Sequence, residues 1–312
     1  MKNLVCKIIL FFTIVLIIDI FVGIVCNSLH TSSKGGLSKG LNDLLNKDVY
    51  DIIVFGSSRA HHHYDTPMIS DSLGLDVYNA GYDGNGIILA YGLLNLISER
   101  YLPSMIIYDV EPTFDINIYQ NDKKYTRYIN FLKPYYNDKA ISEIIKDISL
   151  TEYILLHSSL YRYNTSAISL LIDNLITRKT DIYGYEPLYG SMCSTSRTVV
   201  DDSVEVDFFK LKYLSKLIEF CQVNNIPLVF TASPHYDVLD SEIFEPAVDL
   251  CRKYNVPFLN YYDSEYFRTN ISYFKDPMHL NAKGAREFSK LFVSDILPII
   301  EQQNIRPIIR NY

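Results

Sequence analysis

Short apolar runs that end at glycine or at a polar turn constrain the fold of this chain more than any other feature. They lie at 51–56, 76–81, 104–112, 226–234 and 256–262. Stretches with helical periodicity separate most of them, at 87–101, 208–225, 241–255 and 281–300. Continuous apolar strands that alternate with helices are typical of a parallel sheet covered on both faces. The pattern therefore predicts a three-layer α/β/α domain with a five-stranded parallel sheet.

One long segment interrupts this alternation. Residues 113–206 are rich in Tyr, Asn and Asp, and helical patterns appear near 139–148 and 165–178. We interpret the segment as a single insertion after the third strand, inside one domain of residues 50–312, and not as a separate domain.

The N-terminus predicts a membrane anchor. Residues 8–26 are apolar apart from Asp19, and as a helix they span roughly 28 Å, about one hydrocarbon core. Lys2 and Lys7 precede them, which favours a cytoplasmic N-terminus. We therefore expect a single-pass protein of the cytoplasmic membrane, with its soluble domain on the outer side.

Two alternatives to an uncleaved anchor fit the sequence less well. A cleaved signal peptide lacks a well-spaced small-x-small site after the apolar run. A lipidated Cys26 would follow the large Val25, where a small residue is expected. We favour a signal anchor over residues 1–27, followed by a linker at 28–49 that runs into a short helix.

Charge and cysteine usage exclude several classes of partner. The formal net charge of −7 argues against nucleic acid and against binding to an anionic membrane surface. The five cysteines show no C-x-x-C and no zinc-type spacing, so neither a disulfide framework nor a cysteine metal site is implied. We expect no cofactor.

Polar pieces follow the predicted strands. They are GSSR (56–59), NAGYDG (79–84), DVEP (109–112) and SPHY (233–236), and DPMH (276–279) comes just before the last helix. Ligands of an open parallel sheet bind outside the carboxyl ends of its strands. Segments far apart in sequence are therefore expected to meet at one rim.

Two of these pieces carry the residues of nucleophilic catalysis. A serine hydroxyl needs a base to take its proton, usually a histidine oriented by a third group. Ser58 stands at a strand-to-helix turn, and Asp276 and His279 stand three residues apart on a loop. Alternatively, both residues have purely structural roles: Ser58 caps a helix, and Gly84 allows the backbone of its turn.

These motifs together resemble the SGNH (GDSL-type) hydrolase superfamily over roughly residues 50–300. The matching pieces are G-S-S after the first strand, N-x-x-x-x-G from Asn79 to Gly84, and D-x-x-H before the last helix. The resemblance implies a flavodoxin-like sheet, Ser58 as nucleophile, and a triad completed by His279 and Asp276. It also implies an oxyanion site made by the amides of Ser58 and Gly84.

Two departures from the family pattern refine this expectation. Position 57 is Ser where the family usually has Asp, as in membrane-anchored relatives that acylate exopolysaccharides and cell-wall polymers. In the family, the segment after the third strand usually supplies an Asn side chain that donates to the oxyanion. Here Glu111 lies near the position of that Asn, and a carboxyl group donates a hydrogen bond only when it is protonated.

The resemblance thus implies an esterase or O-acyltransferase acting on acyl esters of envelope or surface glycans, with O-acetyl groups favoured. Envelope polysaccharide assembly proteins are candidate partners. The alternative is a non-catalytic module that kept the fold and binds a glycan or an assembly partner. A phosphate-ester chemistry using Arg59 would need more basic groups than the sequence places there.

Other polar residues near the predicted rim are secondary candidates. Arg59, Glu111 and His235 could contact substrate, although an ion pair of Arg59 with Asp83 or Glu111 is the simpler expectation. His61, His62 and His63 suggest a metal site, but side chains of adjacent helical residues point about 100° apart. We therefore expect no metal site, with one of these histidines packed beneath the active site and the others facing solvent.

Overall fold

The fold is that of a doubly wound α/β protein, seen here in a computed structural model that describes residues 2–118, 125–176, 183–193, 205–237 and 241–308. Five parallel strands form one sheet in the order β2-β1-β3-β4-β5, which is the flavodoxin-like order. The strands are β1 (Ile52–Gly56), β2 (Val77–Gly81), β3 (Met105–Asp109), β4 (Leu228–Ala232) and β5 (Phe258–Asn260). The predicted fold class is confirmed.

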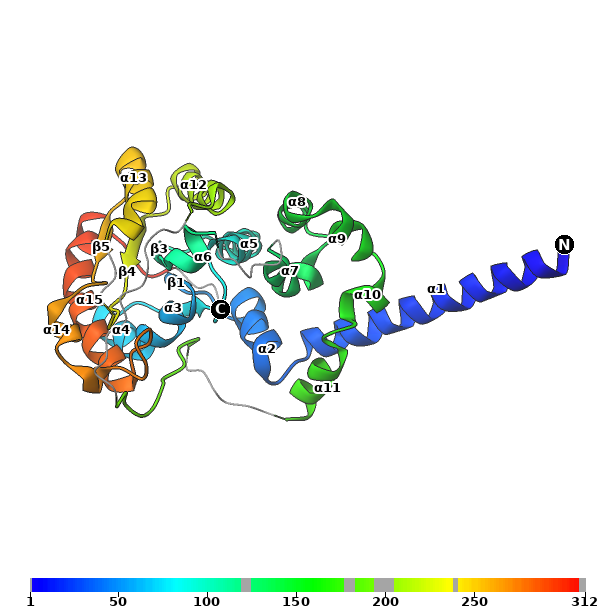
Figure 1. Cartoon of the computed structure of the whole chain (residues 1–312), viewed down its shortest axis with the longest axis horizontal. Coiled ribbons are helices and arrows are strands. Elements are labelled where there is room, and N and C mark those ends of the chain that lie inside the picture. The colour runs from blue at the N-terminus through cyan, green and yellow to red at the C-terminus, as the bar shows by residue number, and fades with distance from the viewer. Residues whose placement is uncertain (1, 119–124, 177–182, 194–204, 238–240, 309–312) are drawn as a thin grey trace. The chain divides into compact units, whose positions relative to one another are not determined.

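Helices cover both faces of this sheet (Figure 1). One layer contains α3 (Ser58–His63), α4 (Thr66–Leu73) and α15 (Ala282–Gln302), and the other contains α5 (Ile87–Ser98), α12 (Phe208–Val223) and α13 (Glu245–Tyr254). Shorter elements are α6 (Pro112–Asp115), α14 (Glu265–Arg268) and the 3₁₀ turns η3 (Ser241–Phe244) and η4 (Ile271–Tyr273). Aromatic side chains of α15 pack against Tyr64 and against the apolar residues of β1.

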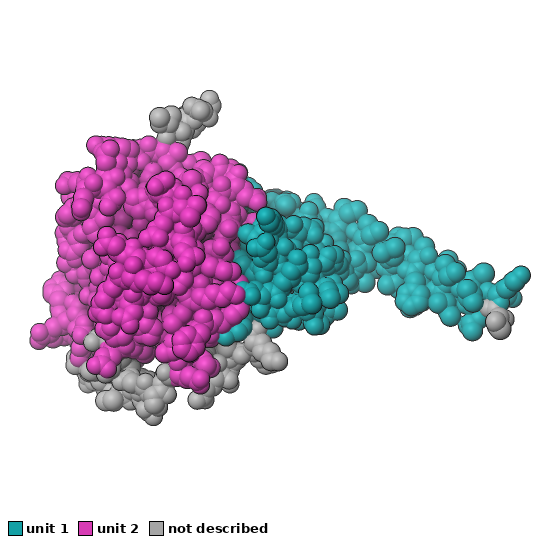
Figure 2. Space-filling view, turned by 90° about the horizontal axis from the view of Figure 1, so that it is seen from above, with its two compact units in different colours: residues 1–47, 124–179 teal, residues 48–123, 180–312 magenta. Residues whose placement is uncertain are grey.

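The chain divides into two compact units, which Figure 2 colours separately. Residues 48–123 and 180–312 form the unit that contains the sheet, and residues 1–47 and 124–179 form a helical unit. The helical unit contains α1 (Lys2–Thr31), α2 (Gly36–Asn42), a π-helix (Asp43–Lys47), α7 (Thr126–Leu132), η2 (Lys133–Tyr135), α8 (Lys139–Ile148), α9 (Leu150–Leu155), α10 (Ser159–Tyr163) and α11 (Ala167–Leu175). The helices predicted near 139–148 and 165–178 are thus present as α8 and α11.

Helix α1 is long and apolar enough to cross a membrane. Its second half packs inside the helical unit, where Cys26 contacts Tyr163 and Leu170. Asp19 accepts hydrogen bonds from the Ser158 hydroxyl at 2.6 Å and from the Leu160 amide at 2.8 Å. This acidic residue therefore holds α1 against the start of α10.

Two glycines let α3 approach the sheet closely. Gly56 has φ +150°, and a Cβ atom on it would lie 2.6 Å from the Asp109 carbonyl oxygen and 2.7 Å from the Ala60 Cβ. A Cβ on Gly81 would lie 2.6 Å from the His61 amide nitrogen. Only glycine fits both positions, and this packing sets the place of every residue of α3.

We expect Gly56→Ala to lower the free energy of unfolding by about 3–5 kcal/mol, because backbone strain and overpacking add. Gly74→Ala is the matched control: Gly74 also has positive φ (+64°), but no atom lies within 4 Å of its added Cβ. That substitution should cost only about 1–2 kcal/mol. Denaturant titrations of both variants check this, and equal losses would show that the close packing of α3 does not require Gly56.

Candidate active site

Ser58 lies at the carboxyl end of the sheet, at the first position of α3. Strand β1 ends at Gly56, Ser57 is the N-cap residue with an extended backbone, and the helix begins at Ser58. Ser57 is fully buried, whereas Ser58 is partly exposed. The turn therefore presents the second serine of the G-S-S motif to solvent and turns the first one inward.

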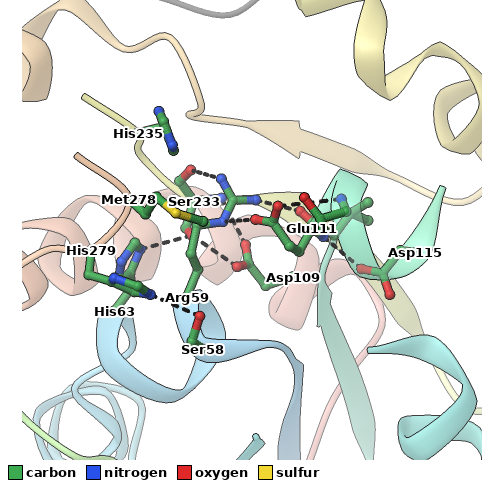
Figure 3. Close-up of polar contacts among 12 residues, drawn as sticks. Ser58, Arg59, His63, Asp109, Glu111, Asp115, Ser233, His235, Met278 and His279 are labelled. Atoms are coloured by element: carbon green, nitrogen blue, oxygen red, sulfur yellow. Dashed lines mark hydrogen bonds and ion pairs between the residues drawn. The ribbon is translucent and has the colours of Figure 1, made fainter. Parts of the chain in front are cut away.

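His279 and Asp276 lie on the loop that precedes α15, and they meet Ser58 as predicted. The Nε2 atom of His279 lies 2.9 Å from the Ser58 hydroxyl oxygen (Figure 3). The Nδ1 atom of the same ring lies 2.9 Å and 3.0 Å from the two carboxylate oxygens of Asp276. Residues 221 positions apart are thus joined into a hydroxyl–imidazole–carboxylate series.

The Asp276 carboxylate is held in place by its own loop. It accepts hydrogen bonds from the amides of Met278 and His279. Burial opposes its ionisation, but the hydrogen bonds and the charge of His279 outweigh burial and lower the pKa of Asp276. An ionised Asp276 accepts the Nδ1–H of His279, which leaves Nε2 free to accept the proton of Ser58.

A buried polar network supports this loop from below. His63 lies with Nδ1 2.9 Å from the Ser233 hydroxyl, and its Nε2 accepts the amide hydrogen of Leu280 at 2.9 Å. The Ser233 hydroxyl donates to Asp109 at 2.9 Å. Burial, with His279 and Arg59 nearby, holds the pKa of His63 well below its usual value, so the ring is neutral. His63 therefore fixes the residue that follows His279.

The prediction that one of the three histidines packs beneath the site holds for His63, but Ser233 and Asp109 had no assigned role. Asp109 accepts further hydrogen bonds from the Tyr64 hydroxyl and the Ser233 amide. Burial raises the pKa of Asp109, and Arg59 with these donors counteracts the rise. The polar pieces DVEP and SPHY were the sequence signal for this network, but the pairing joins residues far apart in the chain.

Arg59 pairs with Glu111, one of its two expected partners. The guanidinium is fully buried, with Nε 2.7 Å from a Glu111 carboxylate oxygen. It also donates to the Val110 carbonyl at 2.6 Å and lies over the Tyr262 ring. The Glu111 carboxylate is therefore the counterion of Arg59. Substrate contact by Arg59 or Glu111 stays a prediction.

Asp115 holds the backbone of the segment that follows β3. Its carboxylate accepts the Glu111 amide at 2.6 Å, the Ile87 amide at 2.8 Å and the Tyr108 hydroxyl at 2.7 Å. Burial raises the pKa of Asp115 to about 7. No sequence signal marked Asp115, and its contacts tie the segment after β3 to the start of α5.

The turn after β2 is built around Asn79, the third residue of that strand. Its side-chain amide donates to the Ala60 carbonyl at 2.7 Å, and its side-chain oxygen accepts the Gly81 amide at 3.0 Å. Gly84 follows in a turn with φ +67°, a backbone conformation that favours glycine. The use of its amide for an oxyanion stays a prediction.

The other two histidines differ from the sequence expectation. The rings of His61 and His62 stack with centroids 4.6 Å apart, and both rings reach Asp83. His62 is buried and does not face solvent. The expectation that it faces solvent is therefore wrong, because its ring is enclosed by contacts with Asp83 and the Glu186 carbonyl.

His235 is buried beside the Arg59 network. Its ring stacks on Tyr262 with centroids 5.0 Å apart, and its Nδ1 accepts the Asp237 amide at 3.1 Å. Burial, aided by the charge of Arg59, lowers the pKa of His235 to about 4. A role of His235 in substrate contact stays a prediction.

This pKa predicts a pH dependence of stability. At pH 5 the unfolded chain binds a proton at position 235 that the folded protein does not bind, so the contribution of His235 is complete above pH 6.5 and falls toward pH 4. We expect the difference in unfolding free energy between the wild type and His235→Gln to shift by about 2 kcal/mol between pH 7 and pH 5, in favour of the variant. Denaturant titrations at both pH values measure it, and parallel profiles would contradict it.

No protein-family model matches the chain, and a search of curated proteins finds no significant match. Among solved structures, an acetyl xylan esterase is similar at 12% identity and a TM-score of 0.40, over 78% of this chain and 99% of that chain. A gut microbial diltiazem-metabolizing enzyme is similar at 12% identity and a TM-score of 0.39, over 80% of this chain and 48% of that one. At these TM-scores the similarity carries no argument, so function is inferred from the geometry of the site.

Proposed function

We propose that the chain is a serine-dependent acyl-ester enzyme, an esterase or an O-acyltransferase, with Ser58, His279 and Asp276 as its triad. The observation that carries the proposal is the pair of contacts made by His279: 2.9 Å from Nε2 to the Ser58 hydroxyl and 2.9 Å from Nδ1 to Asp276. A nucleophile, a base and an orienting carboxylate in this order are the requirements for acyl transfer through serine.

In the first half of the reaction, the Ser58 oxygen attacks the ester carbonyl carbon and His279 takes the hydroxyl proton at Nε2. Asp276 stabilises the resulting imidazolium through Nδ1–H. When the tetrahedral intermediate collapses, the ester C–O bond breaks and His279 gives its proton to the leaving alcohol. Ser58 is left acylated.

In the second half, His279 accepts a proton from the acceptor, whose oxygen attacks the acyl-serine carbonyl. The acyl group leaves with the acceptor, and the proton returns to Ser58. Water as acceptor gives an esterase, and a sugar hydroxyl gives an O-acyltransferase. Partial exposure of Ser58 supports access for either acceptor.

The oxyanion is assigned to the amides of Ser58 and Gly84. Ser58 occupies the first position of α3, where an amide has no acceptor within its own helix. The Glu111 side chain donates no hydrogen bond to the oxyanion, because a carboxylate paired with Arg59 is ionised and can only accept. With the usual third donor missing, we expect a rate below that of a complete oxyanion site, since one donor is typically worth about 10²–10³ in kcat.

The substrates we propose are acyl esters, with O-acetyl groups favoured, on envelope or surface glycans. Helix α1 supports this choice, because a membrane-spanning anchor would hold the enzyme beside the cell envelope. With the N-terminus in the cytoplasm, the sheet-containing unit works outside the membrane. Envelope polysaccharide assembly proteins are the proposed partners.

A non-catalytic glycan-binding or partner-binding module remains the second candidate, and the Glu111–Arg59 ion pair in the third block is the observation that favours it. The reach of His279 to Ser58 and the exposure of Ser58 favour catalysis. A test of serine reactivity separates the two candidates.

We expect a fluorophosphonate probe to label the full-length protein in detergent, because the probe reports an activated serine. Ser58→Ala and His279→Ala should abolish labelling, and both should lower p-nitrophenyl acetate hydrolysis by about 10⁴ or more where the wild type shows it.

Ser57→Ala is the matched control. Ser57 is the neighbouring serine, it is buried, and its hydroxyl has no hydrogen-bond partner among the described residues. Labelling should persist in this variant. A folded wild type that takes up no probe would instead support the binding module, and labelling lost equally in Ser57→Ala would mean that the turn, and not the Ser58 hydroxyl, is being tested.

A further inference from the structure

Two histidines and a carboxylate converge beside the proposed triad and take no part in it. His61 Nδ1 lies 2.9 Å from one oxygen of Asp83, and His62 Nε2 lies 3.2 Å from the same oxygen. One ligand atom from each of the three residues fits within a span of 4.8 Å. The two histidines come from α3, and Asp83 comes from the turn after β2.

The hydrogen bonds of His62 orient its ring toward Asp83. Its Nδ1 lies 2.7 Å from the Glu186 carbonyl oxygen, which can only accept, so Nδ1 carries a hydrogen. The other ring nitrogen, Nε2, therefore points at the Asp83 carboxylate oxygen 3.2 Å away. A cation joins these two atoms, either as a proton on Nε2 or as a metal ion that both atoms bind.

We propose that His61, His62 and Asp83 bind a divalent transition-metal ion, with Zn²⁺ as the best fit. Imidazole nitrogens and a carboxylate are ligands that suit this ion. Ligand atoms about 2.1 Å from a tetrahedral ion lie about 3.4 Å apart, so the nitrogen–oxygen distances need only a small expansion. Asp83 is 61% exposed at its side chain, which leaves the remaining coordination position open to water.

Glu186 completes the arrangement as an outer partner. Its carbonyl oxygen accepts the Nδ1–H of His62, and its carboxylate lies 3.8 Å from the second ring nitrogen of His61, beyond hydrogen-bond distance. Metal-binding histidines commonly donate their other ring hydrogen to a carbonyl or a carboxylate in this way. Glu186 thus orients His62 through a hydrogen bond and places a carboxylate near His61.

An ion at this site would join α3 to the turn that carries Gly84. The ring of His62 also meets the ring of His279 edge to face, with centroids 5.7 Å apart. The ion's proposed role is to hold these segments in place, while acyl chemistry itself proceeds through Ser58. Metal binding is therefore measurable whether or not the protein is an esterase.

The test is zinc binding by the full-length protein in detergent after treatment with a chelator and dialysis. We expect calorimetric titration with ZnCl₂ to show one ion per chain, and Co²⁺ to give the visible absorption of a tetrahedral site. Asp83→Asn and His62→Gln should weaken zinc binding by about 100-fold or more. Glu186→Gln should weaken it much less, because the backbone carbonyl that accepts the Nδ1–H of His62 is retained.

His157→Gln is the matched control, since this ring contacts Tyr153 and Tyr136 in the helical unit and none of the three proposed ligands. It should leave zinc affinity unchanged. If the stripped wild type binds no zinc, or binds it as weakly as Asp83→Asn while both are folded by circular dichroism, the contact is an ordinary His–Asp ion pair and the proposal is wrong. Fluorophosphonate labelling of the same samples reports separately on Ser58.

Discussion

The close approach of α3 to the rim of the sheet is the constraint on which the rest of the site depends. Gly56 and Gly81 leave room for the helix where any side chain would collide with backbone atoms or with Ala60. As a result, residues that follow one another in sequence face different partners: Ser58 meets His279, His62 meets Asp83, and His63 meets Ser233. The short helix α3 thus contacts His279, the turn after β2 and the residue that follows β4.

The residues beneath the site explain how α3 can carry a buried arginine, Arg59. A buried guanidinium is costly unless charges and acceptors surround it. Arg59 has Glu111 at 2.7 Å and carbonyl oxygens of Val110 and Ser233, and it shares its surroundings with Asp109. These contacts link α3 to the segments that follow β3 and β4. Removing one partner of such a buried ion pair typically costs about 3–5 kcal/mol. Glu111, which follows β3, thus serves as the counterion of the buried Arg59.

The strands and the rim that carries the site could be predicted from the sequence. Buried parallel strands are short apolar runs, so β1 and β2 were located to within one residue, and carboxyl ends of parallel strands share one rim. That rule places Ser58 at the rim, whereas the pairing of Ser58 with His279 was expected from the chemistry of a serine nucleophile and from the family resemblance.

The rest depends on pairings that leave no local pattern. His63 and Ser233 are 170 residues apart, and nothing in either segment marks the other as its partner. The burial of His62 also leaves no local pattern, since it depends on contacts with Asp83 and Glu186 from two other segments. Likewise, no periodicity in the 113–206 segment indicates that residues 124–179 group with the N-terminal helix.

The helical unit changes how the anchor should be understood. An acid in an apolar helix is expensive in lipid unless its oxygens are satisfied, and Asp19 accepts hydrogen bonds from Ser158, Ser159 and Leu160 at the start of α10. Beyond Asp19, α1 buries Gly23 and Cys26 against the same unit. The part of α1 that is open all round therefore ends near Ile18, after about 25 Å of helical rise, and exposed residues such as Phe21 and Ile24 continue the apolar face on one side only. Since a hydrocarbon core is about 30 Å thick, the membrane boundary proposed for this helix falls within the packed part of α1.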